Sequence, residues 1–330
     1  MPSRPLFGIL AAAAVVLLPA QKPEPAASPR AAVERSLPLR QEASVRFLKA
    51  SKCVSCHHNT LTVTTLAMAR SGNIRVDEDL AFEQQELISD YVAGWDQPTS
   101  AGPTRPTDVA TVSNVLLGLS VDGFPADDAT DWMVGVLLRQ QANTGEWRAT
   151  PKRFSGDSET IAVTAAAIRA LQVYASKRDR AGYDAVMRRA MTWLENARPQ
   201  DTEGRAHRLL GLDWSHASTE RISQAARDLI ATQRADGGWS QVPGEPSDAY
   251  ATGQALFTLV ETGALAPDGP VYARGAEFLL GGQFEDGSWL VKSRATKLQP
   301  HVDTGFPFGP DQFSSIAATN WATMALALAR

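Results

Sequence analysis

The sequence has 330 residues, of which 32 are basic and 36 are acidic, giving a formal net charge of −4. These charges are scattered along the chain and form no basic stripe, which argues against a nucleic-acid partner. Only two cysteines are present, so a secreted fold held together by several disulfides is excluded.

Residues 1–20, MPSRPLFGILAAAAVVLLPA, predict a secretory signal peptide. Arg4 precedes an apolar run from Leu6 to Leu18, and small residues follow at Pro19 and Ala20. This run is shorter than the about 20 residues that span a bilayer, and an uncleaved N-terminal anchor is the alternative. We therefore expect a bacterial protein that is periplasmic or otherwise exported, with no membrane span after cleavage.

The next segment, residues 21–41, is rich in proline, alanine and charged side chains. Such a composition buries little apolar surface, so it predicts a disordered linker. The remaining residues, 42–330, are enough for one large domain.

A repeat dominates this domain. Six segments rich in alanine and threonine each end in a short apolar motif, at intervals typical of helical hairpins. Their small side chains suit close packing around a central axis, so we expect them to form an inner ring of helices. The six segments are NTLTVTTLAMA from Asn59, TDVATVSNVLLGL from Thr107, SETIAVTAAAIRAL from Ser158, EGRAHRLLGL from Glu203, SDAYATGQALFTL from Ser247 and SSIAATNWATMAL from Ser314.

Other amphipathic segments lie between them and end in a turn with glutamine, glycine and tryptophan. Glycine permits a left-handed turn after a helix, and tryptophan provides a large apolar body for the joint between neighbouring hairpins. We expect these segments to form an outer ring, with the tryptophans buried. The turns contain Gln141 and Trp147, Gln233 and Trp239, and Gln283 and Trp289.

This pattern resembles the QW repeat of squalene-hopene and oxidosqualene cyclases, and the segment GGW…PSDAYATGQAL is similar to the sequence that follows such a repeat. The resemblance implies an all-α fold, an α/α toroid of about six helical hairpins, which is shared with protein prenyltransferase β-subunits. A closed ring needs no polar capping repeats.

The chemistry of the family is missing from the sequence. Those cyclases protonate an alkene with an Asp-x-Asp-Asp acid, and the nearest match is GDSET, with Asp157 and Glu159. They also have two domains, and prenyltransferases hold zinc with a cysteine that has no counterpart after Cys56. Squalene cyclase activity is therefore not expected, and Asp157 and Glu159 are weak catalytic candidates.

Other polar residues lie where a cavity mouth is expected. Asp108 and Asp248 begin inner segments, as acidic residues at helix N-termini commonly do. A long insertion, VKSRATKLQPHVDTGFPFGPDQFSS, follows Trp289, and such loops often shape a site. Its candidates are His301, Asp303 and Asp311.

The run CVSCHH, residues 53–58, occupies the place of the glutamine–tryptophan turn in the first hairpin. Cys-x-x-Cys-His is the attachment sequence of c-type haem, so Cys53 and Cys56 would form thioethers and His57 would bind the iron. Two alternatives stay open. The cysteines are a redox disulfide, or the run is structural or binds a metal weakly, with His58 as a spare ligand.

The haem interpretation leaves the sixth iron ligand unassigned. Met68 and His301 are the first candidates, and His207 and His216 are others. The leading functional hypothesis is thus an exported toroid with covalently attached haem c and a redox or small-ligand role, with a possible redox partner. The alternative is a non-haem toroid that binds or processes an apolar or carbohydrate ligand in its central cavity.

Overall fold

A computed structural model describes residues 22–93, 98–99, 102–103, 108–149, 157–175, 180–296 and 302–329. The predicted signal peptide and His301 lie outside these ranges. Within them, none of the helices combines the length and apolar character needed to cross a membrane.

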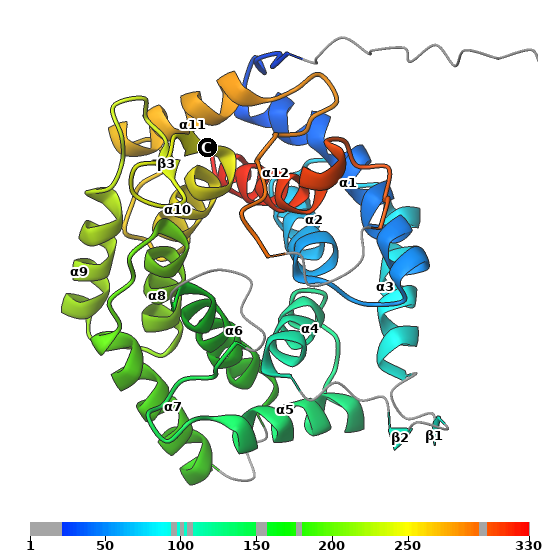
Figure 1. Cartoon of the computed structure of the whole chain (residues 1–330), viewed down its shortest axis with the longest axis vertical. Helices are drawn as coiled ribbons and strands as arrows, with labels where there is room; N and C mark the ends of the chain where they lie inside the picture. Colours follow the sequence, from blue (N-terminus) through cyan, green and yellow to red (C-terminus); the bar gives the residue numbers. More distant parts are fainter. Residues whose placement is uncertain are drawn as a thin grey trace, which may run out of the picture.

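Two concentric rings of α-helices form the described part of the chain (Figure 1). Inner and outer helices alternate along the sequence, so each outer helix and the inner helix after it make one hairpin. The inner helices are α2 (Leu61–Ser71), α4 (Val109–Val121), α6 (Ser158–Tyr174), α8 (Thr202–Trp214), α10 (Ala249–Glu261) and α12 (Gln312–Ala327). The outer helices are α1 (Pro29–Ser51), α3 (Glu78–Ala93), α5 (Asp128–Gln140), α7 (Arg180–Asn196), α9 (Thr219–Ile230) and α11 (Pro270–Gly282).

The inner ring is closed. Each inner helix contacts the next one along the chain, and α12 returns to contact α2. Outside this joint, α1 contacts both α11 and α12, so the first hairpin seals the ring against the last. The prediction of an all-α toroid of six hairpins is confirmed, and all six predicted inner segments are inner helices.

Strands are short in the described part. β1 (Pro98–Thr99) pairs with β2 (Gly102–Pro103), and β3 (Trp239–Ser240) pairs with β4 (Ser247–Asp248), both antiparallel. A π-helix, Cys56–Thr60, precedes α2, and a 3₁₀ turn, Gly309–Asp311, precedes α12. These elements connect helices and build no sheet of their own.

The predicted linker is wrong from Pro29 onward, because α1 begins there. Ser28 caps the helix by accepting a hydrogen bond from the backbone N–H of Ala31. Val33 and Leu37 are buried in the core, four residues apart on one face of the helix. The composition suggested disorder, but apolar residues at helical spacing pack this segment against α12.

The three turns with glutamine, glycine and tryptophan tie neighbouring hairpins together. Each glutamine side chain donates to the glycine carbonyl of its own turn and to a backbone carbonyl of the next outer helix in the ring: Val186 on α7, Val271 on α11 or Ala32 on α1. Each indole N–H donates back to its own outer helix, at Leu137, Leu229 or Leu279. The predicted burial is confirmed, because Trp147, Trp239 and Trp289 are at most 2% exposed.

Candidate functional site

Three consecutive inner helices begin in the same way. Asp157, Asp201 and Asp248 occupy the N-cap positions of α6, α8 and α10. Two positions further on, each helix carries a polar side chain in the same place. These side chains belong to Glu159, Glu203 and Tyr250, and both Glu159 and Tyr250 act on Glu203, so the three lie close together where these helices begin.

Glu203 and Tyr250 form a pair across two inner helices. The Tyr250 hydroxyl donates to Oε1 of Glu203 at 3.2 Å. Burial, followed by the charge of Asp201, raises the pKa of Glu203 to about 7, and Glu159 adds to this. The hydrogen bond from Tyr250 and the charge of Arg294 lower it only in part. Glu203 is therefore a carboxyl group that exchanges a proton near neutral pH.

One turn along α10, Gln254 lies beside this pair. Its side chain is fully buried and lowers the pKa of Tyr250, which burial and the charge of Glu203 raise well above its usual value. Its interaction with the Tyr250 hydroxyl is weak, and within the described part of the chain neither amide atom of Gln254 makes a hydrogen bond of normal geometry. A buried amide without partners is costly, so this position is prepared for a group from outside the chain.

Aromatic rings lie further inside the same ring of helices. The Trp321 ring on α12 is 5.5 Å from Phe257 on α10 and 6.0 Å from His207 on α8, measured between ring centroids. His207 donates from Nδ1 to the backbone carbonyl of Glu203 at 2.9 Å, and burial lowers its pKa. The interior therefore combines an acid and a phenol at its edge with neutral aromatic surface further in.

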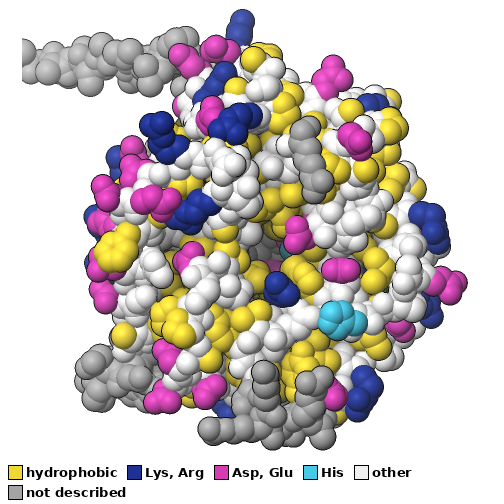
Figure 2. Space-filling model, turned by 180° about the vertical axis from the view of Figure 1, so that it is seen from behind, with side chains coloured by type: hydrophobic (Ala, Val, Ile, Leu, Met, Phe, Trp, Pro, Cys, Tyr) yellow, Lys and Arg dark blue, Asp and Glu magenta, His cyan; other side chains and the backbone are white. Residues whose placement is uncertain are grey.

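The space-filling view from the opposite side shows a hollow at the centre of the molecule, surrounded by hydrophobic and a few charged side chains (Figure 2). In the part of the chain that is described, no group of three or more His, Cys, Asp or Glu side chains could hold a metal ion.

The CVSCHH run connects outer α1 to inner α2, in the place that a glutamine–tryptophan turn takes in three other hairpins. Asn59 fixes the turn: its Oδ1 accepts from the backbone N–H of Ser55 at 2.8 Å, and its Nδ2 donates to Ser44 on α1.

The two cysteines of this turn are thiols with different neighbours. Cys53 is exposed, and its Sγ is 4.0 Å from the hydroxyl of Tyr91 on outer helix α3. Cys56 is half-buried, and its charge contributes to the raised pKa of Tyr250 on inner helix α10. Cys53 thus contacts an outer helix, whereas Cys56 acts electrostatically on a residue of an inner helix.

Both histidines of the turn are buried in an aromatic cluster. His57, 8% exposed, stacks on Phe313 with ring centroids 4.8 Å apart, and His58 stacks on Phe47 at 4.5 Å. His58 also shares a hydrogen bond of 3.3 Å with the Thr304 hydroxyl in the insertion before α12. Burial, then the charge of His57, holds the pKa of His58 well below its usual value.

In this conformation the donor set does not fit haem c. Attachment needs both sulfurs at one macrocycle with the histidine at its iron, whereas Cys53 contacts Tyr91 on α3 and His57 is buried between the rings of Phe47 and Phe313. Haem attachment therefore remains a prediction from the sequence motif and requires the turn to open.

The other predicted site residues are spread over the molecule. Glu159 joins Glu203, but Asp157 is exposed at the start of α6. In the insertion, exposed Asp303 accepts from the backbone N–H of Gly305 in a local turn, and Asp311 accepts from the N–H of Ser293. These two acids stabilise loop structure.

The sixth-ligand candidates are equally dispersed. Met68 packs against the hydrophobic core from α2. His216 follows α8 and is exposed, with its Nε2 3.3 Å from the side-chain amide nitrogen of Gln172. His207 lies in the ring beside Trp321, in a different aromatic contact from that of His57 with Phe313. His301 is outside the described residues.

Sequence reasoning missed Tyr250, Gln254 and Trp321, and it gave Glu203 no role. A signal for two of them was available. If the inner segments are aligned on the aspartates at their N-caps, Glu203 and Tyr250 fall on the position of Glu159. No comparable signal marks Trp321, because aromatic residues also occur at helix positions that only fill a core.

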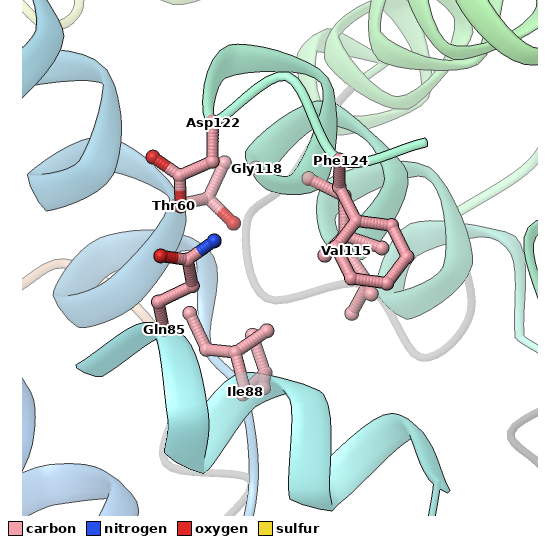
Figure 3. Close-up of a pocket in the computed structure, with 9 residues that line it drawn as sticks. Thr60, Gln85, Ile88, Val115, Gly118, Asp122 and Phe124 are labelled. Carbon is pink, nitrogen blue, oxygen red and sulfur yellow. The ribbon is translucent and has the colours of Figure 1, made fainter. Parts of the chain in front are cut away.

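A small pocket lies on the other side of the cysteine turn, between α3 and α4 (Figure 3). Gln85 and Ile88 approach it from α3, opposite Val115 and Gly118 on α4. Burial raises the pKa of Asp122 at its edge. The complete lining is Val54, Thr60, Gln85, Ile88, Val115, Gly118, Leu119, Asp122 and Phe124.

The sequence matches no protein-family model and no curated protein. Solved structures are similar in fold. A protein from Actinoplanes has a TM-score of 0.59 and 14% identity, over 92% of this chain and 99% of that one. A variant of the type II terpene cyclase MstE from Scytonema, in complex with its substrate geranylgeranyl dihydroxybenzoate, has a TM-score of 0.56 and 13% identity, over 90% and 98%.

A third similar structure is ent-copalyl diphosphate synthase from Streptomyces platensis, with a TM-score of 0.50 and 19% identity. The match covers 89% of this chain and 50% of the synthase, so this chain spans about half of that protein. MstE, by contrast, is matched almost along its whole length. A chain of this size is thus long enough for the toroid of that protein. The chain has the all-α toroid fold found in terpene cyclases.

Proposed function

We propose that this toroid binds a small, largely apolar molecule inside its inner ring, and that Glu203 and Tyr250 meet the polar part of that molecule. One observation carries the proposal. A hydrogen-bonded acid and phenol join inner helices α8 and α10, and the rings of Phe257 and Trp321 pack together on α10 and α12 of the same inner ring. Sites for small molecules commonly combine an apolar lining with a few convergent polar groups.

The chemistry of the pair supports this. Because its pKa is about 7, Glu203 is partly protonated at neutral pH, and a protonated carboxyl group donates a hydrogen bond or a proton to an oxygen atom. Tyr250 keeps its proton, since its pKa is raised. MstE, which has the same fold, binds geranylgeranyl dihydroxybenzoate, a molecule whose name describes an apolar chain on a polar aromatic head.

Ligand binding by the full chain tests the proposal. Isothermal titration with geranylgeraniol, an isoprenoid alcohol, should give a saturable heat. Trp321→Ala should weaken this binding at least about tenfold, because a large aromatic contact is lost. Trp193→Ala, on outer helix α7, is the control and should leave binding unchanged. Equal effects of the two variants, or no saturable binding, would contradict the proposal.

Export and haem attachment form a separate proposal, and it is supported by the sequence alone. The signal peptide and the Cys-x-x-Cys-His motif occur together, as covalent haem attachment outside the cytoplasm requires. In the fold, the motif connects outer helix α1 to inner helix α2. Haem held there would add redox or small-ligand chemistry at the edge of the same ring.

A further inference from the structure

We infer that Glu203, Tyr250 and Gln254 form a subsite for an uncharged oxygen atom, the hydroxyl or carbonyl of an apolar ligand, and that this subsite rejects phosphate and diphosphate groups. The inference rests on the proposed function and specifies which head group the ring accepts.

The first step is the unsatisfied amide of Gln254. Almost all buried polar atoms in proteins have a hydrogen-bond partner, yet within the described residues both amide atoms of Gln254 lack a hydrogen bond of normal geometry, and only a weak interaction with Tyr250 is present. A ligand oxygen would accept from its Nε2, and a ligand hydroxyl would in addition donate to its Oε1. A hydroxyl therefore satisfies both atoms at once.

The second step is the position of that amide. Gln254 interacts with the Tyr250 side chain, and the Tyr250 hydroxyl is hydrogen-bonded to Glu203. The amide, the phenol and the carboxyl group thus converge on one place at the joint of α8 and α10. Three groups that each donate or accept are a suitable cage for a neutral oxygen atom.

The third step is the local charge. Asp201 and Glu159 both act on Glu203 strongly enough to raise its pKa, so negative charge is concentrated there. Asp248, at the start of α10, is a further acid. Among the described residues, Arg294 is the basic group that acts on both Glu203 and Asp248, and its Nη1 donates to Gln241. Among the described residues, one arginine against several acids gives this site an excess of negative charge, which disfavours an anion.

A matched pair of ligands tests the inference in the full chain: farnesol and farnesyl diphosphate, which share the same hydrocarbon. By isothermal titration at pH 7, farnesol should bind at least about tenfold more tightly than the diphosphate. Gln254→Leu should weaken farnesol about tenfold, because the hydrogen bonds to the ligand are lost. Leucine leaves no unsatisfied amide, so this variant should fold. Gln172→Leu on α6, whose amide already donates to the backbone carbonyl of Trp214, is the control and should bind farnesol normally.

A separate variant tests the role of the local negative charge. Glu203→Gln keeps the shape of the side chain and removes its charge, so farnesol binding should persist while the preference over the diphosphate narrows. If the diphosphate binds as tightly as farnesol, the inference is wrong and the proposed function stands. If neither ligand binds, both are wrong. If Gln254→Leu and Gln172→Leu behave alike, Gln254 has no part in the subsite.

Discussion

Arg40 on outer helix α1 donates from Nη1 to Oδ1 of Asn320 on inner helix α12 at 3.1 Å, and both side chains are fully buried. Asn320 also accepts from Thr65 on α2 and donates to the backbone carbonyl of His57. One asparagine therefore joins three helices and the cysteine turn at the place where the ring closes. Burial lowers the pKa of Arg40 to about 9, which shows how poorly this cation is solvated.

Removing the Asn320 side chain should destabilise the protein far more than removing the charge of Arg40. Asn320→Ala leaves Arg40 charged, buried and short of an acceptor, and should lower the free energy of unfolding by about 3 kcal/mol or more. Arg40→Met removes that charge, and Thr62 and Thr65 still donate to Asn320, so we expect a change of about 1 kcal/mol or less. Urea unfolding measures both. Arg46→Met, at an exposed position, is the control and should change the free energy of unfolding by close to zero. An equally small change for Asn320→Ala would contradict the prediction.

The glycines of the glutamine–tryptophan turns allow close packing between hairpins, and this can be tested. Gly237 has φ of 85°, and a Cβ on it would run into the backbone carbonyl of Arg274 on the next outer helix. Gly244 has a similar φ of 91°, with nothing within 4 Å of a Cβ. Gly244→Ala should therefore cost about 1 to 2 kcal/mol, from backbone strain alone. Gly237→Ala should cost at least about 2 kcal/mol more, since the hairpins must also separate. Thermal unfolding of the two variants checks this, and equal losses would rule out close packing at the turn.

Burial of the same turn can be measured by removing its tryptophan. Trp239 is fully buried, and its indole N–H donates to the Leu229 carbonyl at 3.0 Å. Trp239→Ala should lower the free energy of unfolding by about 3 kcal/mol or more, because it opens a large cavity. Trp132→Ala, at a half-buried position on α5, is the comparison and should lower the free energy of unfolding by less. A loss below about 0.5 kcal/mol would mean that Trp239 does not hold the hairpins together.

The fold could be predicted because its signals are local and repeated. The turns at Trp147, Trp239 and Trp289 recur in one pattern, and the small residues of each inner helix reflect packing at one common axis. The start of α1 was missed for the opposite reason. Pro29 and Pro38 suggest a linker, whereas the segment is ordered by contacts with α12, almost 300 residues later in the chain. Contacts of that kind leave no trace in local composition.

The site was predicted only in part, because it depends on which side chains meet across the ring. Glu159 was a candidate from its motif, but the pairing of Glu203 with Tyr250 exists only after α8 and α10 pack together. Asp303 was a candidate because it is an acid in a long loop, yet its carboxylate accepts a hydrogen bond within its own turn. Spacing along the chain indicates helix faces, and it does not indicate which faces converge.

The raised pKa of Glu203 predicts how stability depends on pH. The folded-state value of about 7 lies above the ordinary value of 4.5, so the stabilising form is the neutral one. Its contribution is complete below about pH 4.5 and is lost as the pH rises to about 7. The acids and the base that act on it are Asp201, Glu159 and Arg294. The glutamine in Glu203→Gln is always neutral. At pH 8 the free energy of unfolding of this variant should therefore exceed that of the native protein by on the order of 2 kcal/mol, and at pH 4 the two should differ little.

Denaturant unfolding at several pH values measures this difference. Glu195→Gln, a half-buried acid on outer helix α7, is the matched control and should show no comparable gain at pH 8. A Glu203→Gln variant with the same pH profile as the native protein would show that Glu203 is an ordinary surface carboxylate, and it would remove the acid from the proposed function.

The haem prediction is tested by producing the full chain with its signal peptide in cells that attach c-type haem. Thioether bonds are covalent, so haem should stay with the polypeptide after acid-acetone extraction and give a c-type pyridine haemochrome spectrum. Replacing Cys53 and Cys56 by alanine should abolish this retention. The structure adds a condition: His57 must leave its stack with Phe313, so Phe313→Ala should increase the fraction of protein that carries haem. Phe284→Ala, a buried aromatic residue near α11, is the control and should not. If the protein is colourless and its mass shows the loss of two hydrogens at the cysteine pair, the motif is a redox disulfide and the haem prediction is wrong.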